Sequence, residues 1–363
     1  MIDLVKLEIE GDFPPLGKCL RVTHRVDVVS ESFTADRYWL YGEGADFEAQ
    51  IKDERKSLWL TFCPLKILQG HNGIGSNNLR KLVMYSVLEI CNHLNIPITP
   101  ELEKKLCEGD YRLREVHVTE LHKMPHALIP AFCQSIRGNA PDDLHAVPLD
   151  RGIGVRLWPN SRYRQVLIYD KVHYFMDKTW KHREVLVAGA SNWTKASLQM
   201  RFDQLLDYLK QGIRIECRLK SAYLCRNKLD RGSAWTKQIA RQEYIKMLST
   251  IPLSDVPPVE GIEKIITELS GPEKALVLLW KDGRDPKKFA SSKAAYYRLC
   301  KSIKEKSGID IKRPCSNFPS GVSWPELIKP ESIVPNPSFS RHSAIYFDTH
   351  DPVFIERLNA KKK

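Results

Sequence analysis

The stretch Arg164-Gln165-Val166-Leu167-Ile168-Tyr169-Asp170-Lys171-Val172-His173-Tyr174 has the alternation of a β-strand. Every second side chain of a strand lies on the same face, so Tyr169 and Lys171 are expected to share one face. A tyrosine beside a lysine in a strongly basic chain points to attack on a phosphodiester. The alternative is a half-buried strand in which both are ordinary surface residues, and short motifs of this kind are weak by themselves. The rest of the chain has to decide between these interpretations.

The charge balance is the most unusual property of the composition. The 363 residues carry a formal net charge of +12, while the apolar fraction of 42% is ordinary for a folded protein. Such an excess of positive charge points to nucleic acid or another polyanion as a partner, although it says nothing about the fold. A chain of this length can form two domains and a sizeable core.

Cysteine usage and the lengths of the apolar runs indicate the compartment. The nine cysteines are irregularly spaced and never form a C-x-x-C pair, which favours reduced thiols over a disulfide framework or a cysteine zinc site. The N-terminus mixes acids with apolar residues, unlike a signal peptide. No apolar run reaches membrane-spanning length. The sequence therefore predicts a soluble, intracellular protein.

Short strands and one amphipathic helix account for most of the first 250 residues. Residues 1–10 predict a first strand and residues 12–17 a turn. Several alternating segments within residues 19–63 predict a meandering antiparallel sheet. Residues 137–162 indicate a loop and hairpin region, and residues 195–209 an amphipathic helix.

A glycine-rich loop precedes a second clear helix. Residues 64–78 contain three glycines within six positions and end in the candidate N-caps Ser76 to Asn78. Helical periodicity follows over residues 79–94, and Pro97 and Pro100 are expected to close the helix. A glycine-rich loop that opens a helix can approach a phosphate closely. The Gly-Lys-Ser/Thr ending of a nucleotide-hydrolysing loop is missing, however.

Histidines in and after the strand predicted over residues 114–122 suggest a metal. His117 belongs to this strand, and His122 and His126 follow. Pro125 breaks any helix that would bring His122 and His126 together, and no cysteine completes a tetrahedral set. The sequence therefore disfavours zinc.

The most regular strand in the chain is predicted over residues 213–220. Apolar and charged residues alternate there without a fault for eight positions. The charged face is formed by Arg214, Glu216, Arg218 and Lys220. A single carboxylate among three cations is either a salt-bridged structural acid or a metal ligand, and on its own the structural interpretation is favoured.

The character of the sequence changes near residue 250. Residues 254–259 indicate a linker, and residues 261–280 a helical unit with a break at Gly271-Pro272. Residues 281–313 are rich in Lys and Arg, with a helix expected over residues 291–306 that includes neighbouring tyrosines. Basic side chains interleaved with aromatics suit phosphate contact with some stacking, and a solvated helix face is the common alternative. The Pro- and Ser-rich end is expected to be partly extended, with a mobile tail.

Together these segments resemble the gene II replication-initiation proteins of filamentous bacteriophages and related phage and plasmid replication proteins. The resemblance rests on ordered blocks that span roughly residues 1–313. These blocks are Lys66-Ile67-Leu68-Gln69-Gly70-His71-Asn72, Val166-Leu167-Ile168-Tyr169-Asp170-Lys171, Ile213-Arg214-Ile215-Glu216-Cys217-Arg218-Leu219-Lys220, and Ser292 to Ile311. Each block is weak alone, and the ordered set is fairly specific.

The resemblance implies a rolling-circle initiator. Such a protein nicks one strand at an origin, stays joined to the 5′ phosphate through a tyrosine, leaves a 3′ hydroxyl as primer, and later rejoins the ends. A phenol is a poor nucleophile at neutral pH without help, which a divalent metal on the scissile phosphate supplies. Tyr169 is then the candidate nucleophile, and Lys171 the candidate stabiliser of the phenolate or the pentacovalent phosphate. Resealing needs no nucleotide cofactor, because the tyrosyl phosphodiester conserves the bond energy.

The resemblance also implies Mg²⁺ or Mn²⁺, with Glu216 as first ligand and His117 and His71 as further candidates. Related proteins often have Arg-x-Asp where this chain has His117, and a histidine favours Mn²⁺ over Mg²⁺. Glu115 or Glu120 are expected alternatives as ligands. For His71, fixing the glycine-rich loop by hydrogen bonds is an equally good interpretation.

The candidate DNA contacts lie along the basic segments. They are Arg214, Arg218, Lys220, Lys66, Arg298 and Lys301. Tyr174 follows Tyr169 by five residues. That spacing turns it well away on a helix and puts it on the opposite face of a strand, so a single-tyrosine enzyme is predicted.

The predicted fold is α+β. It consists of an antiparallel sheet with helices packed on one side over residues 1–250, resembling a replication-initiator nuclease, followed by a small, basic, mainly helical DNA-binding or accessory domain over residues 251–363. The predicted function is a nicking-closing endonuclease of phage or phage-like plasmid origin. The alternatives are a non-catalytic DNA-binding regulator and a plasmid mobilisation nickase. The expected partners are double-stranded origin DNA, displaced single-stranded DNA, and a host helicase and polymerase in the host bacterial cytoplasm, with no membrane.

Overall fold

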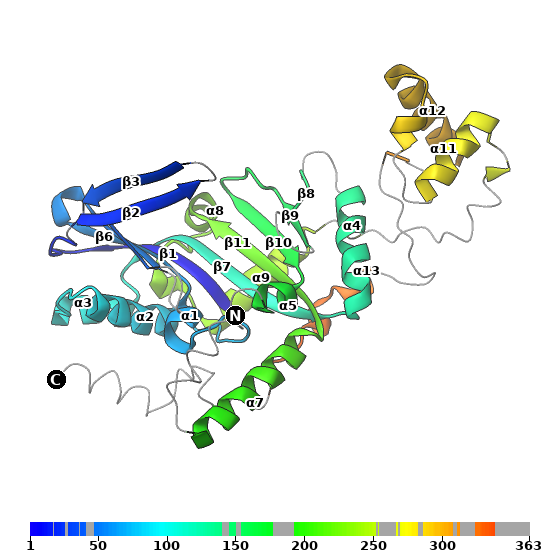
Figure 1. Cartoon of the computed structure of the whole chain (residues 1–363). Helices are drawn as coiled ribbons and strands as arrows, with labels where there is room; N and C mark the ends of the chain where they lie inside the picture. Colours follow the sequence, from blue (N-terminus) through cyan, green and yellow to red (C-terminus); the bar gives the residue numbers. More distant parts are fainter. Residues whose placement is uncertain are drawn as a thin grey trace.

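The computed structural model of the chain has a mixed α/β fold built around an antiparallel sheet (Figure 1). It describes residues 1–16, 18–25, 28–35, 37–40, 47–139, 145–149, 154–176, 192–251, 253, 266–267, 269–281, 286–307, 311–312 and 324–337. The strands are β1 (Ile2–Glu10), β2 (Lys18–Arg25), β3 (Val28–Ala35), β4 (Arg37–Leu40), β5 (Phe47–Lys52), β6 (Ser57–Phe62), β7 (Arg112–Lys123), β8 (Val147–Pro148), β9 (Gly154–Leu157), β10 (Arg164–Tyr169) and β11 (Gly212–Lys220). The helices are α1 (Pro64–Gln69), α2 (Leu79–His93), α3 (Pro100–Glu108), α4 (Ile129–Asn139), α5 (Lys171–Tyr174), α7 (Asn192–Leu209), α8 (Ser221–Arg226), α9 (Lys237–Leu248), α11 (Gly271–Lys281), α12 (Lys293–Ser307) and α13 (Trp324–Leu327). In the described part of the chain, no helix has the length and apolar character needed to cross a membrane.

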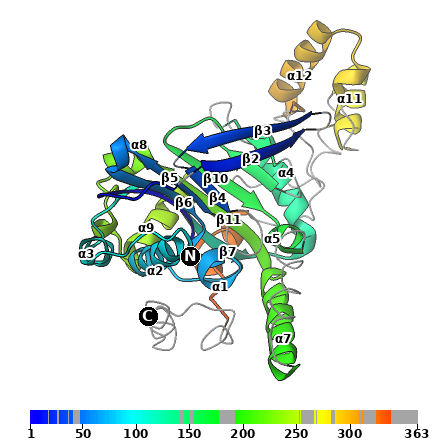
Figure 2. The same ribbon diagram turned by 60° about the vertical axis from the view of Figure 1, so that its left-hand side comes forward.

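The sheet brings together strands that are distant in sequence. Its order is β4-β5-β6-β1-β7-β11-β10-β9-β8, and neighbouring strands run antiparallel. The predicted antiparallel sheet is therefore confirmed. β2 and β3 pair only with each other, and this ribbon lies beside β4 (Figure 2). The strands that carry the candidate site, β7, β11 and β10, are direct neighbours.

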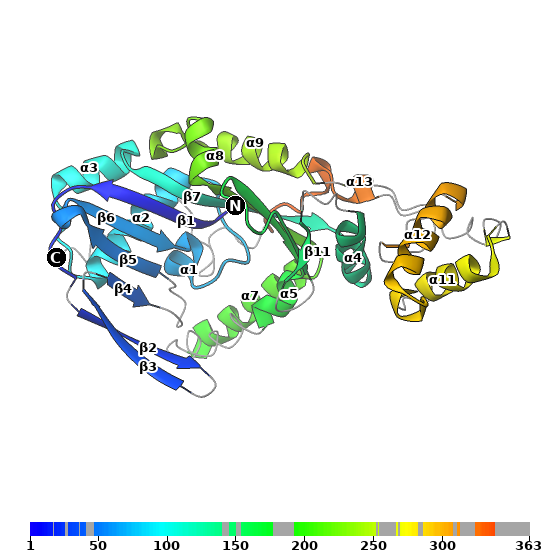
Figure 3. The same ribbon diagram turned by 90° about the horizontal axis from the view of Figure 1, so that it is seen from above.

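One face of the sheet forms the main hydrophobic core. The alternating residues Val5, Val116, Cys217 and Leu219 are all fully buried on this face. They belong to the same cluster as buried residues of α2, α8 and α9. Figure 3 shows α8 and α9 running along this side of the sheet. Period-two alternation thus decides which side chains are removed from water, and burial of this apolar surface is the main favourable term for the fold.

The other face is covered at one end by α7. Leu121 of β7 points away from Val116 and Val118, and it packs with Phe202 and Leu205 of α7 in a second cluster. α7 lies across the sheet from α8 and α9 in Figure 3. The expectation that helices pack on one side only is therefore wrong. Its cause is the amphipathic stripe of α7, which needs an apolar partner and finds it on the face that also carries the charged residues.

The glycine-rich loop is buried rather than open. Residues 71–76 are all buried. A Cβ atom at Gly73 would meet the side chain of Leu205, and one at Gly75 would meet Leu65, so both glycines are required by close packing. The expected close approach of this loop to a phosphate is not what the packing shows. The N-cap prediction is confirmed at Asn78, whose side chain accepts a hydrogen bond from the Lys81 amide at the start of α2.

Two predicted boundaries differ from the structure. Pro100 does not close a helix but occupies the first turn of α3, where a missing amide hydrogen costs nothing and Thr99 caps the helix. β10 ends at Tyr169, because the Asp170 side chain accepts a hydrogen bond from the Val172 amide and starts α5. Lys171 is therefore not on the strand with Tyr169, contrary to the prediction from the sequence.

The C-terminal segments belong to two different clusters. α11 and α12 form a third hydrophobic cluster of their own and stand apart from the sheet (Figures 1 and 3). Residues 324–337 return to the main body: Trp324 packs on Phe132 at 5.0 Å between ring centroids, and the Val334 amide donates to the Leu121 carbonyl. Part of the predicted C-terminal domain thus contributes to the core of the first 250 residues. The predicted linker 254–259 and the terminal tail lie outside the described residues.

Candidate active site on the sheet

The register of three strands places the candidate residues on one face. Tyr169 pairs with Arg214, and the next outward rows of β11 carry Glu216 and Arg218. On the other side of β11, Arg218 pairs with His117 of β7. Since alternate residues of a strand share a face, Tyr169, Glu216, Arg218 and His117 lie together on the face opposite the main core.

Side-chain contacts join these residues into one cluster around Glu216. The Tyr169 hydroxyl donates to Glu216 Oε2 at 3.1 Å, and Arg218 Nε donates to Oε1 at 2.7 Å. His117 Nδ1 lies 3.0 Å from the same Oε1, while its Nε2 lies 2.8 Å from Glu115 Oε1. Glu216 and His117 are buried, Tyr169 is half-buried, and the Arg218 side chain is 27% exposed. The cluster is thus open to an incoming group mainly at Tyr169 and Arg218.

The electrostatics of the cluster keep the proton on the tyrosine. Burial raises the pKa of Tyr169 well above its ordinary value, and the Glu216 charge adds to the rise, while Arg214 opposes it. Burial alone would raise the pKa of Glu216, but Arg218 and His117 outweigh it and hold that pKa well below the usual range. Burial likewise lowers the pKa of His117, and its bonds to Glu115 and Glu216 raise it overall. The resting state is a neutral phenol hydrogen-bonded to a carboxylate.

Lys171 occupies a position that the sequence did not predict. Its ammonium is buried at the start of α5, donates to Asn72 Oδ1 at 2.8 Å, and lies 4.4 Å from the centroid of the Tyr174 ring. Burial lowers the pKa of Lys171 to about 7, with Arg214 adding to the drop and Asp3 opposing it. The hydrogen bond of the Tyr169 hydroxyl goes to Glu216 and not to Lys171.

Lys171 should make stability depend on pH in a defined window. Between its folded pKa of about 7 and its ordinary value of 10.5, the unfolded chain holds a proton that the folded chain has released. Stability therefore rises with pH in this range, by roughly 2–3 kcal/mol between about pH 7 and about pH 9 for this group. We expect the Lys171→Met protein to lose that part of the slope in urea unfolding measured at both pH values. Parallel slopes for the two proteins would contradict the assignment.

A buried polar network lies beneath the tyrosine, and two of its members, Asp3 and Asn72, were not predicted from the sequence. Asp3 accepts from Asn72 Nδ2 at 2.7 Å and pairs with the Arg214 guanidinium at 3.2 Å. Arg214 also donates to the Asn72 carbonyl. All three residues are buried. Asn72 thus links the loop to β1, β11 and, through Lys171, to α5.

This network corrects the role expected for Arg214. With the guanidinium in the interior and committed to Asp3 and Asn72, Arg214 has no surface for a DNA phosphate. It is instead the buried cation that lowers the pKa of Tyr169, working against burial. The charge assigned to Lys171 from the sequence is therefore supplied beneath Tyr169 by Arg214.

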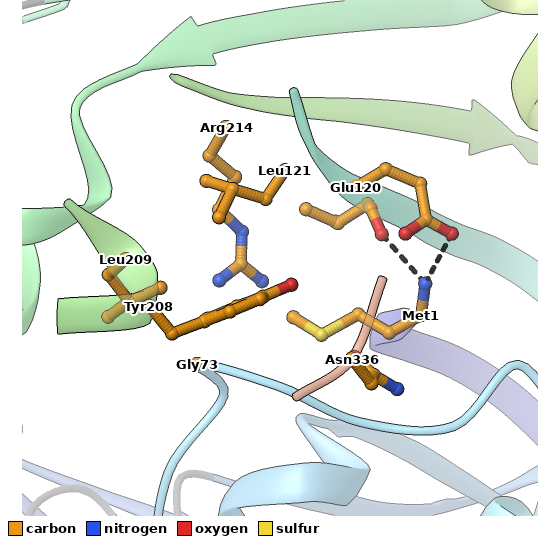
Figure 4. Close-up of a pocket in the computed structure, with 9 residues that line it drawn as sticks. Met1, Gly73, Glu120, Leu121, Tyr208, Leu209, Arg214 and Asn336 are labelled. Carbon is orange, nitrogen blue, oxygen red and sulfur yellow. Dashed lines mark hydrogen bonds and ion pairs between the residues drawn. The ribbon is translucent and has the colours of Figure 1, made fainter. Parts of the chain in front are cut away.

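A small cavity lies next to this network (Figure 4). Arg214 and Tyr208 extend toward it, and the Met1 amino group at its edge contacts Glu120 at 2.9 Å. Arg214 Nε and Thr119 Oγ1, both among the lining residues, are buried without a protein partner. Unpaired buried polar atoms of this kind suit an ordered water. Tyr169 does not line the cavity, which therefore lies apart from the proposed chemistry.

The remaining candidates are distributed over the molecule. His71 is buried, and its Nδ1 accepts from the Gly73 amide at 3.2 Å, which is the loop-fixing arrangement expected as the alternative. Lys220 Nζ donates to the Ser161 carbonyl at 2.8 Å at the end of β11. Lys66 is half-buried in α1. Arg298 and Lys301 lie on α12, away from the sheet.

The donor set around Glu216 does not form a preformed metal site. Both carboxylate oxygens of Glu216 and both ring nitrogens of His117 are engaged with protein groups, and Arg218 adds a positive charge at the same oxygen. His71 faces its own loop instead. Over the residues that the structure describes, no three His, Cys, Asp or Glu side chains are grouped to hold a metal ion. The expected ligand set of Glu216, His117 and His71 does not fit this arrangement.

Comparison with known proteins decides the family. The family model for the N-terminal part of the phage replication-associated protein encoded by gene II matches residues 31–238, more than half of the chain. The chain belongs to this family. It is also 24% identical over 261 residues to the replication-associated protein of the same kind from Enterobacteria phage I2-2, covering 70% of this chain and 69% of that protein. No solved structure matches the chain.

Membership in this replication-associated family confirms the resemblance to the filamentous-phage gene II proteins that the ordered sequence blocks indicated. The matched range includes β7, β10 and β11. Tyr169, Glu216, Arg218 and His117 therefore all lie in the part of the chain that defines the family, whereas α11 and α12 lie beyond it.

Proposed function

We propose that this chain is a phage replication initiator that nicks one strand of a double-stranded origin through Tyr169. It stays joined to the 5′ phosphate, starts rolling-circle replication, and religates the displaced single strand. The observation that carries the proposal is the Tyr169 hydroxyl held 3.1 Å from Glu216, beside Arg218 on one sheet face. This is a nucleophile, a proton acceptor and a phosphate-binding cation in one place.

The proposed reaction balances without a cofactor that supplies energy. The Tyr169 oxygen attacks the scissile phosphorus in line, and the bond from phosphorus to the 3′ oxygen breaks. The phenol proton is lost to the protein, and the leaving 3′ oxygen gains a proton to become a hydroxyl. A phosphotyrosine diester replaces one phosphodiester, so the reverse attack by a 3′ hydroxyl rejoins the strand and restores Tyr169.

Arg218 connects DNA binding to activation of the tyrosine. In the resting state the Arg218 charge is the largest influence that lowers the pKa of Glu216. A phosphate that takes over the Arg218 guanidinium removes this partner, so the pKa of Glu216 rises and the carboxylate becomes a better proton acceptor. Glu216 then takes the phenol proton, and Arg214 beneath the ring stabilises the phenolate.

Protein groups alone carry these steps, because Glu216, His117 and His71 do not form the expected ligand set. The requirement for Mg²⁺ or Mn²⁺ stays a prediction from the family resemblance. Nicking rates measured in each ion and in chelator test it directly. Lys171 is assigned a supporting role through Asn72 rather than contact with the phosphate.

The wider interactions follow from this role. Arg218 and Lys220 on the sheet and Lys66 on α1 are proposed contacts for origin DNA. Arg298 and Lys301 are proposed contacts within a basic C-terminal domain over residues 251–363. A host helicase and polymerase would extend the 3′ hydroxyl in the host bacterial cytoplasm. These assignments rest on charge and on the proposed reaction.

The deciding experiment incubates the full chain with supercoiled origin DNA and Mg²⁺ or Mn²⁺. We expect nicked DNA whose 5′ end is bound covalently to protein and whose 3′ end a polymerase extends. Salt-sensitive binding without any nicking would overturn the proposal in favour of a non-catalytic regulator of replication. Nicking only at a plasmid transfer origin would favour the mobilisation nickase.

A further inference from the structure

One stripe of α12 carries an exposed aromatic ring among lysines. Tyr297 is 44% exposed, although it belongs to a helix that packs well elsewhere. Lys293 and Lys301 lie four residues before and after it, so the three share one face. Four residues of helix rise by about 6 Å, which places a cation on either side of the ring. Lys304 extends the stripe by a further turn.

The rest of α12 shows that this ring is not part of the core. Tyr296, Cys300 and Ile303 form the buried face that joins α12 to α11. Tyr296 contacts the edge of the Tyr297 ring at a centroid distance of 5.4 Å, and Lys312 Nζ lies 5.2 Å from its centroid. The ring is therefore steadied by its neighbours while much of it remains in water.

A second exposed aromatic lies in the same unit. Phe289 is 58% exposed and directly follows Lys287 and Lys288. Between residues 286 and 307 the only acid is Glu305, which forms a 3.8 Å surface pair with Lys301. Such exposed pairs are weak, and a phosphate can replace them. The surface thus combines aromatic rings with an excess of positive charge.

We infer that the stripe formed by Lys293, Tyr297 and Lys301 binds single-stranded DNA, with a base stacked on the Tyr297 ring and phosphates paired with the lysines. Base stacking on an aromatic ring is tolerant of sequence and needs an unstacked base. In a duplex the faces of the bases are covered by their neighbours, so a ring on a helix surface favours a single strand. Only the identification of that strand as the one displaced at the origin rests on the proposed function.

The test measures fluorescence anisotropy of a labelled oligothymidylate with the full chain. We expect Tyr297→Ala to weaken binding by roughly 5- to 100-fold. Tyr297→Phe should bind nearly as wild type, because the ring and not the hydroxyl stacks. Lys301→Gln should also weaken binding and reduce the slope of log K against log salt by about 0.7, the value for one phosphate contact on a single strand.

The matched control is Leu278→Ala, which removes a side chain that is 48% exposed on α11 of the same unit but outside the stripe. It should bind as wild type, and thermal melting should show all variants folded. Unchanged binding by Tyr297→Ala, or an equal loss for Leu278→Ala, overturns the inference. An equal loss on a duplex of the same length would overturn it in favour of duplex binding. Since the oligonucleotide contains no origin, these outcomes do not depend on whether the chain nicks DNA.

Discussion

The Tyr169→Phe protein is expected to bind supercoiled origin DNA and leave it uncut. The substitution removes only the hydroxyl, which is the proposed nucleophile and donates to Glu216 at 3.1 Å. Glu216 keeps Arg218 and His117 as partners, so the fold and the charge of the site should persist. Loss of a covalent nucleophile typically lowers the rate by about 10⁴-fold or more. Nicking is measured on agarose gels, and the covalent adduct as labelled DNA retained on denatured protein.

Tyr174→Phe is the matched control for this substitution. Tyr174 lies in the adjoining helix α5, exposed, with the Lys171 ammonium over its ring. Phenylalanine keeps that ring, so nicking and adduct formation should continue at the wild-type rate. An adduct formed by Tyr169→Phe, or one lost in Tyr174→Phe, would move the nucleophile away from Tyr169. Equal melting temperatures for the three proteins exclude unfolding as the cause.

Strands with uninterrupted alternation could be predicted well from the sequence. Residues 213–220 alternate without a fault, and the strand in the structure extends this range only by Gly212. The same pattern predicted that Glu216 and Arg218 share a face, because a period of two fixes the face of every residue once the strand exists. The helix at residues 79–94 was predicted for the same reason, since periodicity and an N-cap at Asn78 agreed.

The partners of Tyr169 could not be predicted in this way. The pairing of β10, β11 and β7 is long-range, and alternation within a strand does not specify which strand lies beside it. The end of β10 was missed because a residue two places after Tyr169 shares its face only while the strand continues. Asp170 ends the strand through one local hydrogen bond, and Lys171 turns into the interior.

A break in the strand register explains why Asp3 was missed. An acid in the alternating segment 1–10 looked like an ordinary exposed charge. In the structure the pairing of β1 with β7 shifts between Ile2 and Leu4, and Asp3 is buried against Asn72 and Arg214. A bulge changes which face a residue occupies, and sequence alternation alone does not reveal it.

The return of residues 324–337 to the core was equally hidden. Pro and Ser in this segment suggested an extended end, yet Ser332 contacts His122 at 2.9 Å and Trp324 is buried. The signal available was the large aromatic Trp324 itself, which seldom occurs in a solvated tail. The partners of this segment come from β7 and α4, far earlier in the chain, so only the folded chain identifies them.

The Glu216→Gln protein is expected to bind origin DNA at least as tightly as wild type while nicking it about 10²- to 10⁴-fold more slowly. Glutamine can still accept a hydrogen bond from Tyr169, but it cannot take the phenol proton. The substitution also removes a negative charge beside Arg218, which favours an incoming phosphate. Binding is measured on uncleaved DNA by gel shift, and nicking in single-turnover reactions, so that the two effects are separated.

Glu115→Gln is the control that isolates the contact with Tyr169. Glu115 also contacts His117, at 2.8 Å, whereas the Tyr169 hydroxyl donates to Glu216. We expect Glu115→Gln to slow nicking by less than about tenfold, as a change in the surroundings of His117 alone. Equal losses in both variants would show that Glu216 acts through His117 rather than on the hydroxyl. Unimpaired nicking by Glu216→Gln would mean that a different group accepts the proton, and the pairing of Tyr169 with Glu216 would then describe only the resting state.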